Sequence, residues 1–261
     1  MLQATTVAVG KTKGGRGHPF SFAPRLQWPE PASCHPVLLA IRHEAMPTTK
    51  EYPMRNLILG AALAISSLFG ITAHAEPVAG QQYVELKSPV PVSKPGKVEV
   101  VELFWYGCPH CYQFEATLNP WVEKLPDDVN FVRIPALFGG IWNVHGQAFI
   151  TLEMMKVEHK VHDAVFTAIH QEKKKLGSAE EFADFVATQG VDRDAFLKTF
   201  NSFAVKGQME KAKKLAMAYQ ITGVPVMIVG GKYRFDLGSA GGPQQTLEVA
   251  DHLIAKERAA L

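Results

Sequence analysis

The sequence predicts an α/β fold whose sheet is interrupted by an all-helical insertion. Two β-rich blocks, residues 83–134 and 226–235, are separated by a stretch with helical but no strand periodicity. The first block alternates strand, helix and strand, which implies a parallel pair of strands joined by a right-handed crossover. The second block is a hairpin that turns at Gly230 and Gly231. A βαβ unit and a hairpin on either side of a helical region therefore define the expected architecture.

The first block opens the expected folded part of the chain. Its elements are a short strand-like piece, a central strand, a helix and a second strand, at 83–86, 98–106, 112–124 and 129–134. The central strand is too continuously apolar to keep one face in water, so we expect it to be buried. Phe114, Leu118 and Val122 recur at helical spacing and form the apolar side of the helix.

The rest of the chain enters the insertion and then returns to the sheet. Four amphipathic segments are expected in the insertion, at 146–157, 159–171, 179–188 and 193–200. A long helix, two hairpin strands, a loop and a closing helix follow at 205–219, 226–229, 232–235, 238–243 and 244–260. We assign 139–212 to the helical insertion, and 76–138 together with 213–261 to the sheet domain.

The motif Cys108-Pro109-His110-Cys111 lies where the central strand passes into the helix. Two sulfurs one helical turn apart can close a small disulfide ring and reopen it with little backbone movement. The unpaired N–H groups and the positive end of the helix dipole stabilise a thiolate at Cys108. The thiolate is the attacking and leaving species in disulfide exchange. Pro109 has no N–H to lose in the first turn, and His110 adds a donor and a potential positive charge.

The composition limits the other classes of function. The chain has 261 residues and a net charge of +2, which indicates no nucleic-acid partner. Of its three cysteines, Cys34 lies far upstream, so one pair remains, within a single motif. We expect no structural disulfide and no four-sulfur zinc site. His159 and His162 lie on one expected helix face near Glu158, but without further ligands we expect no metal there, and no cofactor.

Residues 54–75 have the three parts of a secretory signal peptide. Arg55 gives a positive start, 57–71 is an apolar run, and the small residues Ala73 and Ala75 frame a cleavage pattern. We expect cleavage after Ala75 and export to the periplasm. A membrane anchor is the main rival, although the run is near the lower length limit for spanning; a buried core helix is the third reading.

Residues 1–53 precede this signal and are rich in Gly and Pro, without periodicity. A secretory signal should begin a protein, so we expect translation to start at Met54 and the upstream residues to be a start-site misassignment. The alternative is a disordered cytosolic extension. We expect no packed structure there in either case.

Two residues outside the motif have two readings each. Glu102 is a carboxylate within the apolar central strand. It either faces water at a strand edge or is a partly buried proton acceptor beneath Cys111 that helps the second thiol ionise. Pro225 precedes a strand, and because few X-Pro bonds are cis, the sequence by itself does not assign its geometry.

The motif, the helical insertion and Gly223-Val224-Pro225 together resemble the DsbA family, periplasmic thiol:disulfide oxidases with a thioredoxin-like fold. The resemblance covers residues 76–261, and the stretch 104–112 (FWYGCPHCY) is specific to this branch. It implies a thioredoxin-like α/β fold carrying the all-helical insertion as a subdomain. It also implies that Cys108 and Cys111 alternate between a disulfide and two thiols.

The resemblance also implies roles for single residues. Cys108 would be the exposed nucleophile and Cys111 the buried resolving thiol. Pro225 would be a cis-proline facing the disulfide, and Val224 would offer backbone hydrogen bonds to a substrate strand. Glu102 matches the buried acidic residue of the family.

Partners follow from the same resemblance. Unfolded secreted proteins with reduced cysteines would be the substrates, and a quinone-linked inner-membrane oxidase of the DsbB type would restore the disulfide. A well-stabilised thiolate at Cys108 favours the reduced enzyme and makes the disulfide oxidising. His110 is expected to contribute to this stabilisation.

Other functions on the same residues remain open. A reductase or isomerase is the nearest rival, although no dimerisation domain is visible and we expect a monomer. A non-catalytic peptide-binding chaperone would use an apolar surface around Trp105, Tyr106 and Val224, and on any reading these residues are candidates for substrate contact. A metallochaperone would use the two cysteines as ligands, which the proline and the helix placement disfavour.

Overall fold

The structure is a computed structural model and describes residues 76–261. The expected start at Met54, the signal segment 54–75 with its cleavage site after Ala75, the extension 1–53 and Cys34 lie outside the described residues. Within 76–261, none of the helices has both the length and the apolar character needed to cross a membrane.

A mixed sheet of five strands organises this part of the chain, in the order β1-β5-β4-β2-β3. The strands are Val84–Glu85 (β1), Val98–Phe104 (β2), Val129–Pro135 (β3), Val226–Val229 (β4) and Tyr233–Asp236 (β5). β2 pairs in parallel with β3 and antiparallel with β4, and β4 and β5 form the expected hairpin. The βαβ unit and the hairpin thus meet at β2.

β2 is the buried strand that its composition predicts, since all seven of its residues are buried. Alternate side chains face opposite sides of a strand. Val98 and Val100 belong to the apolar cluster on one face, while Val101 and Leu103 belong to the cluster on the other. The strand ends at Phe104 and not at Tyr106, because the chain turns there and the N–H of Cys108 donates to the carbonyl of Trp105 at 3.0 Å.

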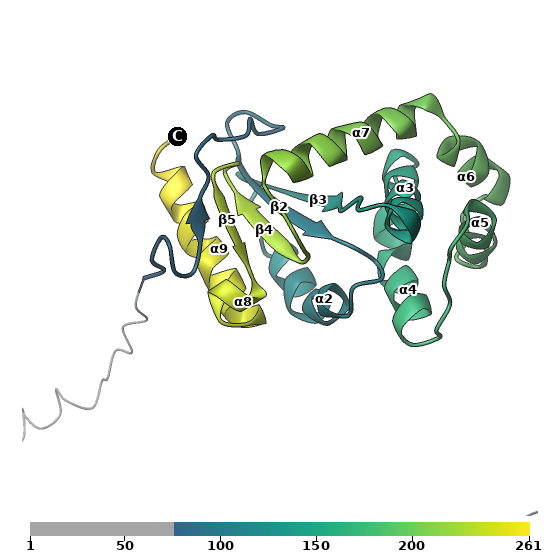
Figure 1. Ribbon diagram of the computed structural model, residues 1–261, viewed down its shortest axis with the longest axis horizontal. Helices are drawn as coiled ribbons and strands as arrows, with labels where there is room; N and C mark the ends of the chain where they lie inside the picture. Colours follow the sequence, from purple (N-terminus) through teal and green to yellow (C-terminus); the bar gives the residue numbers. More distant parts are fainter. Residues whose placement is uncertain (1–75) are drawn as a thin grey trace, which may run out of the picture. The chain divides into compact units, whose positions relative to one another are not determined.

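Helices cover both faces of the sheet (Figure 1). One face packs against α2 (Pro109–Val122) and α9 (Pro243–Arg258), which place Phe114, Leu118 and Leu253 in the same core cluster. The other face packs against α7 (Phe203–Ala218), through Ala212 and Ala216. The expected loop at 238–243 begins within a short helix, α8 (Leu237–Ala240), because Asp236 and Ser239 form a capping box.

The insertion is helical, as its periodicity predicts. It contains α3 (Gly140–Met154), α4 (Glu158–His170), α5 (Ala179–Thr188) and α6 (Arg193–Phe200). Serine and aspartate side chains cap α5 and α6, where Ser178 and Asp192 accept backbone N–H groups. α3 starts at Gly140 and not at 146, directly after Gly139, whose φ of 98° favours glycine.

α7 joins the insertion to the sheet domain. Figure 1 shows it running from the α3–α6 group back to the sheet. Val205 and Met209 pack into the core of the insertion, while Ala212 and Ala216 pack on the sheet. The expected boundary between 212 and 213 therefore falls inside one continuous helix. The insertion core also includes Cys108 and Cys111, so the reactive pair lies where the two parts meet.

Candidate active site

Cys108 occupies the N-cap position of α2. Its backbone is extended (φ −85°, ψ 118°), and its Sγ accepts the N–H of Cys111 at 3.4 Å. Pro109 is the first helical residue, where its missing N–H costs no hydrogen bond. His110 follows with an exposed side chain. The strand-to-helix junction therefore directs free N–H groups at the first sulfur.

The environment at the N-terminus of α2 lowers the pKa of Cys108 from about 9.0 to about 6. The largest cause is the hydrogen bond from the Cys111 thiol, which outweighs the opposing effect of burial. The backbone N–H groups of Cys111 and His110 contribute next, and the charge of His110 contributes last. At neutral pH Cys108 is therefore largely a thiolate, stabilised more by its partner cysteine than by the histidine between them.

Cys111 has the opposite character. It is completely buried, and both cysteines are present as thiols in this structure. Burial raises its pKa strongly, and the nearby Cys108 and Glu102 raise it further. Two cysteines three positions apart thus differ in their readiness to ionise, because the pKa of Cys108 is lowered and that of Cys111 is raised.

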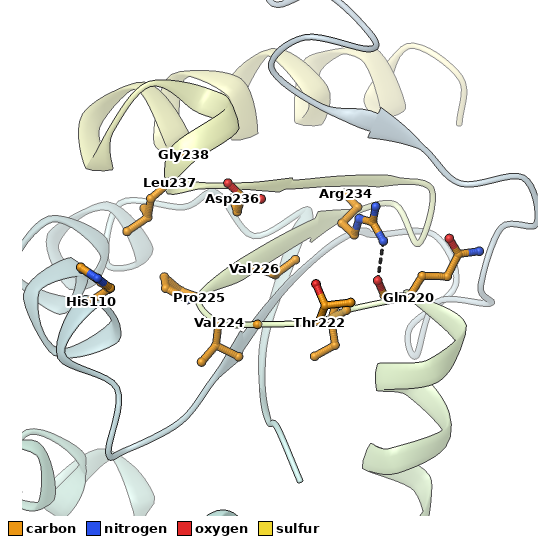
Figure 2. A pocket seen from close by; sticks show the side chains of 12 residues that line it. His110, Gln220, Thr222, Val224, Pro225, Val226, Arg234, Asp236, Leu237 and Gly238 are labelled. Carbon is orange, nitrogen blue, oxygen red and sulfur yellow. Dashed lines mark hydrogen bonds between the residues drawn. The ribbon is translucent and has the colours of Figure 1, made fainter. Parts of the chain in front are cut away.

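Val224 and Pro225 lie opposite the first sulfur. The peptide bond between them is cis, the geometry implied by the family resemblance. In its protonated form, the Cys108 thiol donates to the carbonyl oxygen of Val224 at 3.5 Å. Both residues line a pocket of about 500 Å³ that extends from His110 to Gln220 and Arg234. Figure 2 shows His110 at one end of this pocket, with Val224 and Pro225 between it and Arg234.

Glu102 is fully buried in β2, so the reading that places it in water is wrong. Its Oε2 accepts the Nε–H of Arg133 at 3.0 Å, while its Oε1 has no hydrogen-bond partner. Burial raises the pKa of this carboxyl to about 7; repulsion by Glu115 adds to the effect, and attraction by Arg133 opposes it. A carboxyl near Cys111 that titrates near neutrality can take up and return a proton.

Arg133 and Glu115 complete a charged group that the sequence reasoning missed. The Nη2 of Arg133 donates to Glu115 at 3.0 Å and to Asn119 at 2.7 Å, so one guanidinium bridges two buried carboxylates. The available signal was an arginine within the mostly apolar stretch 129–134. In the sheet this arginine pairs in register with Glu102 of β2. A charge in a buried strand needs a partner of opposite sign.

Trp105 and Tyr106 are placed very differently. Trp105 is half-buried and stacks on Trp142 of α3, with ring centroids 3.9 Å apart. Gly107 lies against this ring, where any Cβ would clash with it. Tyr106 is only 1% exposed. The expected apolar surface therefore does not include Tyr106, because its ring packs inward and its hydroxyl reaches His162 at 3.0 Å.

His159 and His162 have different surroundings, and no cluster of three potential metal ligands occurs among the described residues. His159 is exposed and His162 is buried. His162 instead faces Glu115 and Glu158, at 3.6 Å and 3.1 Å. Their spacing of three residues predicted that the two histidines share one helix face, but only His162 faces the core.

Comparisons with known proteins identify the family of the chain. The family described as "DSBA-like thioredoxin domain" matches residues 99–250, more than half of the chain. A thiol:disulfide interchange protein DsbA from Pseudomonas aeruginosa is 73% identical over 208 residues, covering 79% of this chain and 99% of that protein. A protein of the same name from Azotobacter vinelandii is 65% identical over 213 residues, with 79% and 100% coverage.

Solved structures give the same result. The crystal structure of Pseudomonas aeruginosa DsbA matches with a TM-score of 0.69 at 74% identity, covering 70% of this chain and 96% of that one. The crystal structure of the oxidoreductase DsbA from Xylella fastidiosa matches with a TM-score of 0.67 at 34% identity, with 71% and 100% coverage.

Proposed function

The chain belongs to the DSBA-like thioredoxin family and is a thiol:disulfide oxidoreductase, and we propose that Cys108 and Cys111 carry its exchange reaction in the oxidising direction. The observation that carries the proposal is the contrast between the two sulfurs. The pKa of Cys108 is lowered to about 6, while burial raises that of Cys111. A stabilised thiolate favours the reduced enzyme, so its disulfide accepts electrons readily.

The reaction begins with a substrate thiolate that attacks the Sγ of Cys108 in the oxidised enzyme. The Cys108–Cys111 bond breaks, a mixed disulfide forms at Cys108, and Cys111 leaves as a thiolate that takes a proton. A second substrate thiolate then attacks the substrate sulfur of the mixed disulfide. Cys108 leaves as a thiolate, the substrate gains a disulfide, and the enzyme gains two electrons.

We assign to Glu102 the transfer of a proton to and from Cys111. Glu102 raises the pKa of Cys111 through its charge, so the two groups lie within electrostatic reach. In its protonated form it can supply a proton to the departing Cys111 thiolate. As a carboxylate it can accept the proton again when Cys111 attacks during reoxidation. Its own pKa of about 7 suits both directions near neutrality.

The surface around Cys108 is the proposed site for a substrate chain. The Val224 carbonyl accepts a hydrogen bond from the Cys108 thiol, so the same backbone group can bind an extended strand beside the mixed disulfide. Pro225 and His110 line the adjoining pocket, and the half-buried side chain of Trp105 is a further candidate for contact with the substrate. Tyr106 has no part in this surface because it is buried.

The partners and the compartment are also proposals. We assign unfolded secreted proteins with reduced cysteines as substrates, a DsbB-type membrane oxidase as the source of the disulfide, and the periplasm as the location. The signal-like segment 54–75 supports the compartment. Sequencing the N-terminus of the exported protein tests it, with Glu76 as the expected first residue and Met54 or Met1 as the contrary result.

Two assays on one preparation test the direction of the reaction. The oxidised enzyme should restore activity to a reduced, unfolded secreted enzyme faster than glutathione buffer alone. The reduced enzyme should be a weak catalyst of insulin reduction. Strong insulin reduction with no effect on oxidative refolding would assign the chain to the reductase class. An intact cellular activity of Cys108→Ser would favour a non-catalytic chaperone.

A further inference from the structure

A charged cluster connects the helical insertion to the underside of the active-site helix. Glu102 of β2, Glu115 of α2 and Arg133 of β3 come from the sheet domain. Glu158 and His162 come from α4 of the insertion. The cluster therefore contains three carboxylates and one guanidinium, and His162 is the remaining group that can carry a positive charge.

His162 lies in the centre of this group and is 4% exposed. The rings of Phe104, Phe149 and Phe166 surround it in edge-to-face arrangements. Its Nδ1 is 3.0 Å from the hydroxyl of Tyr106 and 3.1 Å from Oε1 of Glu158. An imidazole in an apolar shell retains a charge only where acids compensate the lost hydration.

The other ring nitrogen faces an acid as well. Nε2 of His162 lies 3.6 Å from Oε1 of Glu115, and both atoms are buried without a hydrogen-bond partner. Oε1 of Glu102 is a further buried oxygen without one. A proton on Nε2 would face Glu115, whose other oxygen already binds Arg133. The unpartnered oxygens of Glu115 and Glu158 therefore face the two ring nitrogens of His162, which can donate to them when the ring is protonated.

Electrostatics favour the charged form of His162. Burial by itself lowers its pKa, but the carboxylates of Glu115 and Glu158, which face its two ring nitrogens, more than offset this, and the pKa is raised although Arg133 opposes it. The charge of His162 in turn lowers the pKa of Glu102. Further groups lie around the cluster: Glu158 raises the pKa of Glu153 of α3, His159 lowers the pKa of Glu158, and Asp163 of α4 raises that of Tyr106.

We propose that His162 is a positioning residue for disulfide exchange, whose imidazolium supplies the second positive charge of the cluster and keeps Glu102 able to accept the proton of Cys111. This inference rests on the proposed role of Glu102. It also assigns a function to the insertion. α4 supplies a charge to the proton-transfer group beneath the cysteines, in addition to covering them.

The step concerned is the attack of Cys111 on a mixed disulfide at Cys108. The Cys111 thiol loses its proton to the Glu102 carboxylate, and the thiolate attacks the Sγ of Cys108. The Cys108–Cys111 bond forms, the bond to the other sulfur breaks, and that sulfur leaves as a thiolate. Without a positive charge on His162, Glu102 holds its proton to a higher pH, and the step needs a higher pH.

The reagent dithiobis(nitrobenzoate) reports the reactions of the two cysteines one after the other. Cys108 releases the first coloured thiolate on attack, and Cys111 releases the second when it resolves the mixed disulfide. In wild type, we expect the rate of the second release to rise with pH through the titration of Glu102. His162→Gln keeps a polar side chain but has no charge. It should move the midpoint of this rise upward by about 0.5–1 pH unit and leave the first release unchanged.

His145→Gln is the matched control. His145 is also a buried histidine of the insertion, at 2% exposure, but its Nε2 binds the carbonyl oxygen of Lys175 and no carboxylate. This variant should change thermal stability without moving the midpoint. An equal shift in both variants, or no shift in His162→Gln, would overturn the inference.

Two further measurements keep the inference separate from the proposed function. In Glu102→Gln, the pH dependence of the second release should disappear; if it persists, Glu102 is not the proton acceptor, and the inference fails with it. If it disappears but His162→Gln has no effect, only the inference fails. Nitrogen NMR of the wild-type imidazoles needs no variant to fold. Both nitrogens of His162 should be protonated at neutral pH, and a neutral ring would contradict the proposal.

Discussion

The backbone N–H of Cys111 donates to the Sγ of Cys108 at 3.4 Å, so the second cysteine of the motif stabilises the thiolate of the first. The Cys111 thiol adds a second hydrogen bond and is the largest cause of the lowered Cys108 pKa. In the reduced protein, Cys111 therefore lowers the pKa of the cysteine with which it forms the disulfide.

The first prediction compares the two neighbours of Cys108. Cys111→Ala removes the thiol donor and should raise the Cys108 pKa by about one unit or more. His110→Gly removes a smaller contribution, so its increase should be smaller, and the enzyme should become slightly more reducing. Ultraviolet absorbance of the thiolate against pH measures the pKa, and equilibration with glutathione measures the potential. A larger pKa change in His110→Gly would contradict the assigned order.

The second prediction separates attack from resolution. Cys108→Ser should reduce exchange to the uncatalysed rate, because the buried Cys111 cannot reach a substrate. Cys111→Ser should still attack and should accumulate a mixed disulfide with a substrate cysteine. Intact-protein mass spectrometry detects the adduct, and its appearance in Cys108→Ser in place of Cys111→Ser would reverse the assigned roles.

The third prediction concerns stability against pH. The folded pKa of Cys108, about 6, is below its ordinary value of 9.0, so its ionisation stabilises the reduced protein fully above pH 9 and progressively less as the pH falls through 6. The pKa of Cys111 is raised, so its effect on stability has the opposite sign. The buried neutral thiol costs nothing below its ordinary pKa of 9.0, and the reduced protein loses stability as the pH rises above that value. The stability of the reduced form relative to the oxidised form should therefore rise from about pH 6 to about pH 9 and then level or fall.

Urea unfolding of both forms across this range measures the difference. The oxidised form is the appropriate reference because it has neither thiol. A difference that is constant between pH 6 and pH 9 would show that the Cys108 thiolate is not stabilised by folding.

The fourth prediction concerns Arg133. Arg133→Met leaves Glu102 and Glu115 buried without their shared cation, which should lower the free energy of unfolding by about 3–5 kcal/mol at neutral pH. The loss should shrink in acid. A buried carboxyl with a raised pKa destabilises the fold only as the pH rises above its ordinary value of about 4.5 and through its folded one. Urea unfolding at neutral and acid pH checks both parts.

Arg258→Met is the matched control for Arg133. Arg258 also binds an aspartate through two nitrogens, but both side chains of its pair with Asp128 are almost half exposed. Surface ion pairs contribute little to stability. A similar loss in both variants would mean that burial of the Arg133 group does not determine its effect.

Several features of the site were predictable because they depend on neighbouring residues. The strand-to-helix junction follows from the change of periodicity before and after the motif, and it places Cys108 at an N-cap. The burial of β2 was expected from its mostly apolar composition, although two of its seven residues are glutamates. The proton-accepting reading of Glu102 required its burial, which the sequence left open because a carboxylate in a mostly apolar strand fits either a core or an edge.

Other features depend on segments that are distant in the sequence. Tyr106 looked like part of an aromatic surface, but its hydroxyl binds His162, which lies 56 positions away. His162 itself looked like half of a weak metal pair, because helical spacing shows which residues share a face but not what that face contacts. Arg133 reaches Glu115 and Glu102 only through the pairing of β2 and β3 and the packing of α2.

By itself, the sequence determined the α/β class, the helical insertion and the position of a reactive cysteine pair, because periodicity and motif spacing are local properties. Only the tertiary structure decided that Glu102 is buried, that Arg133 and Glu115 form a charged group with it, and that α4 contributes a histidine to the same cluster. The physical reason is that a pKa depends on burial and on nearby charges, and the fold brings these from β2, β3, α2 and α4 to one place.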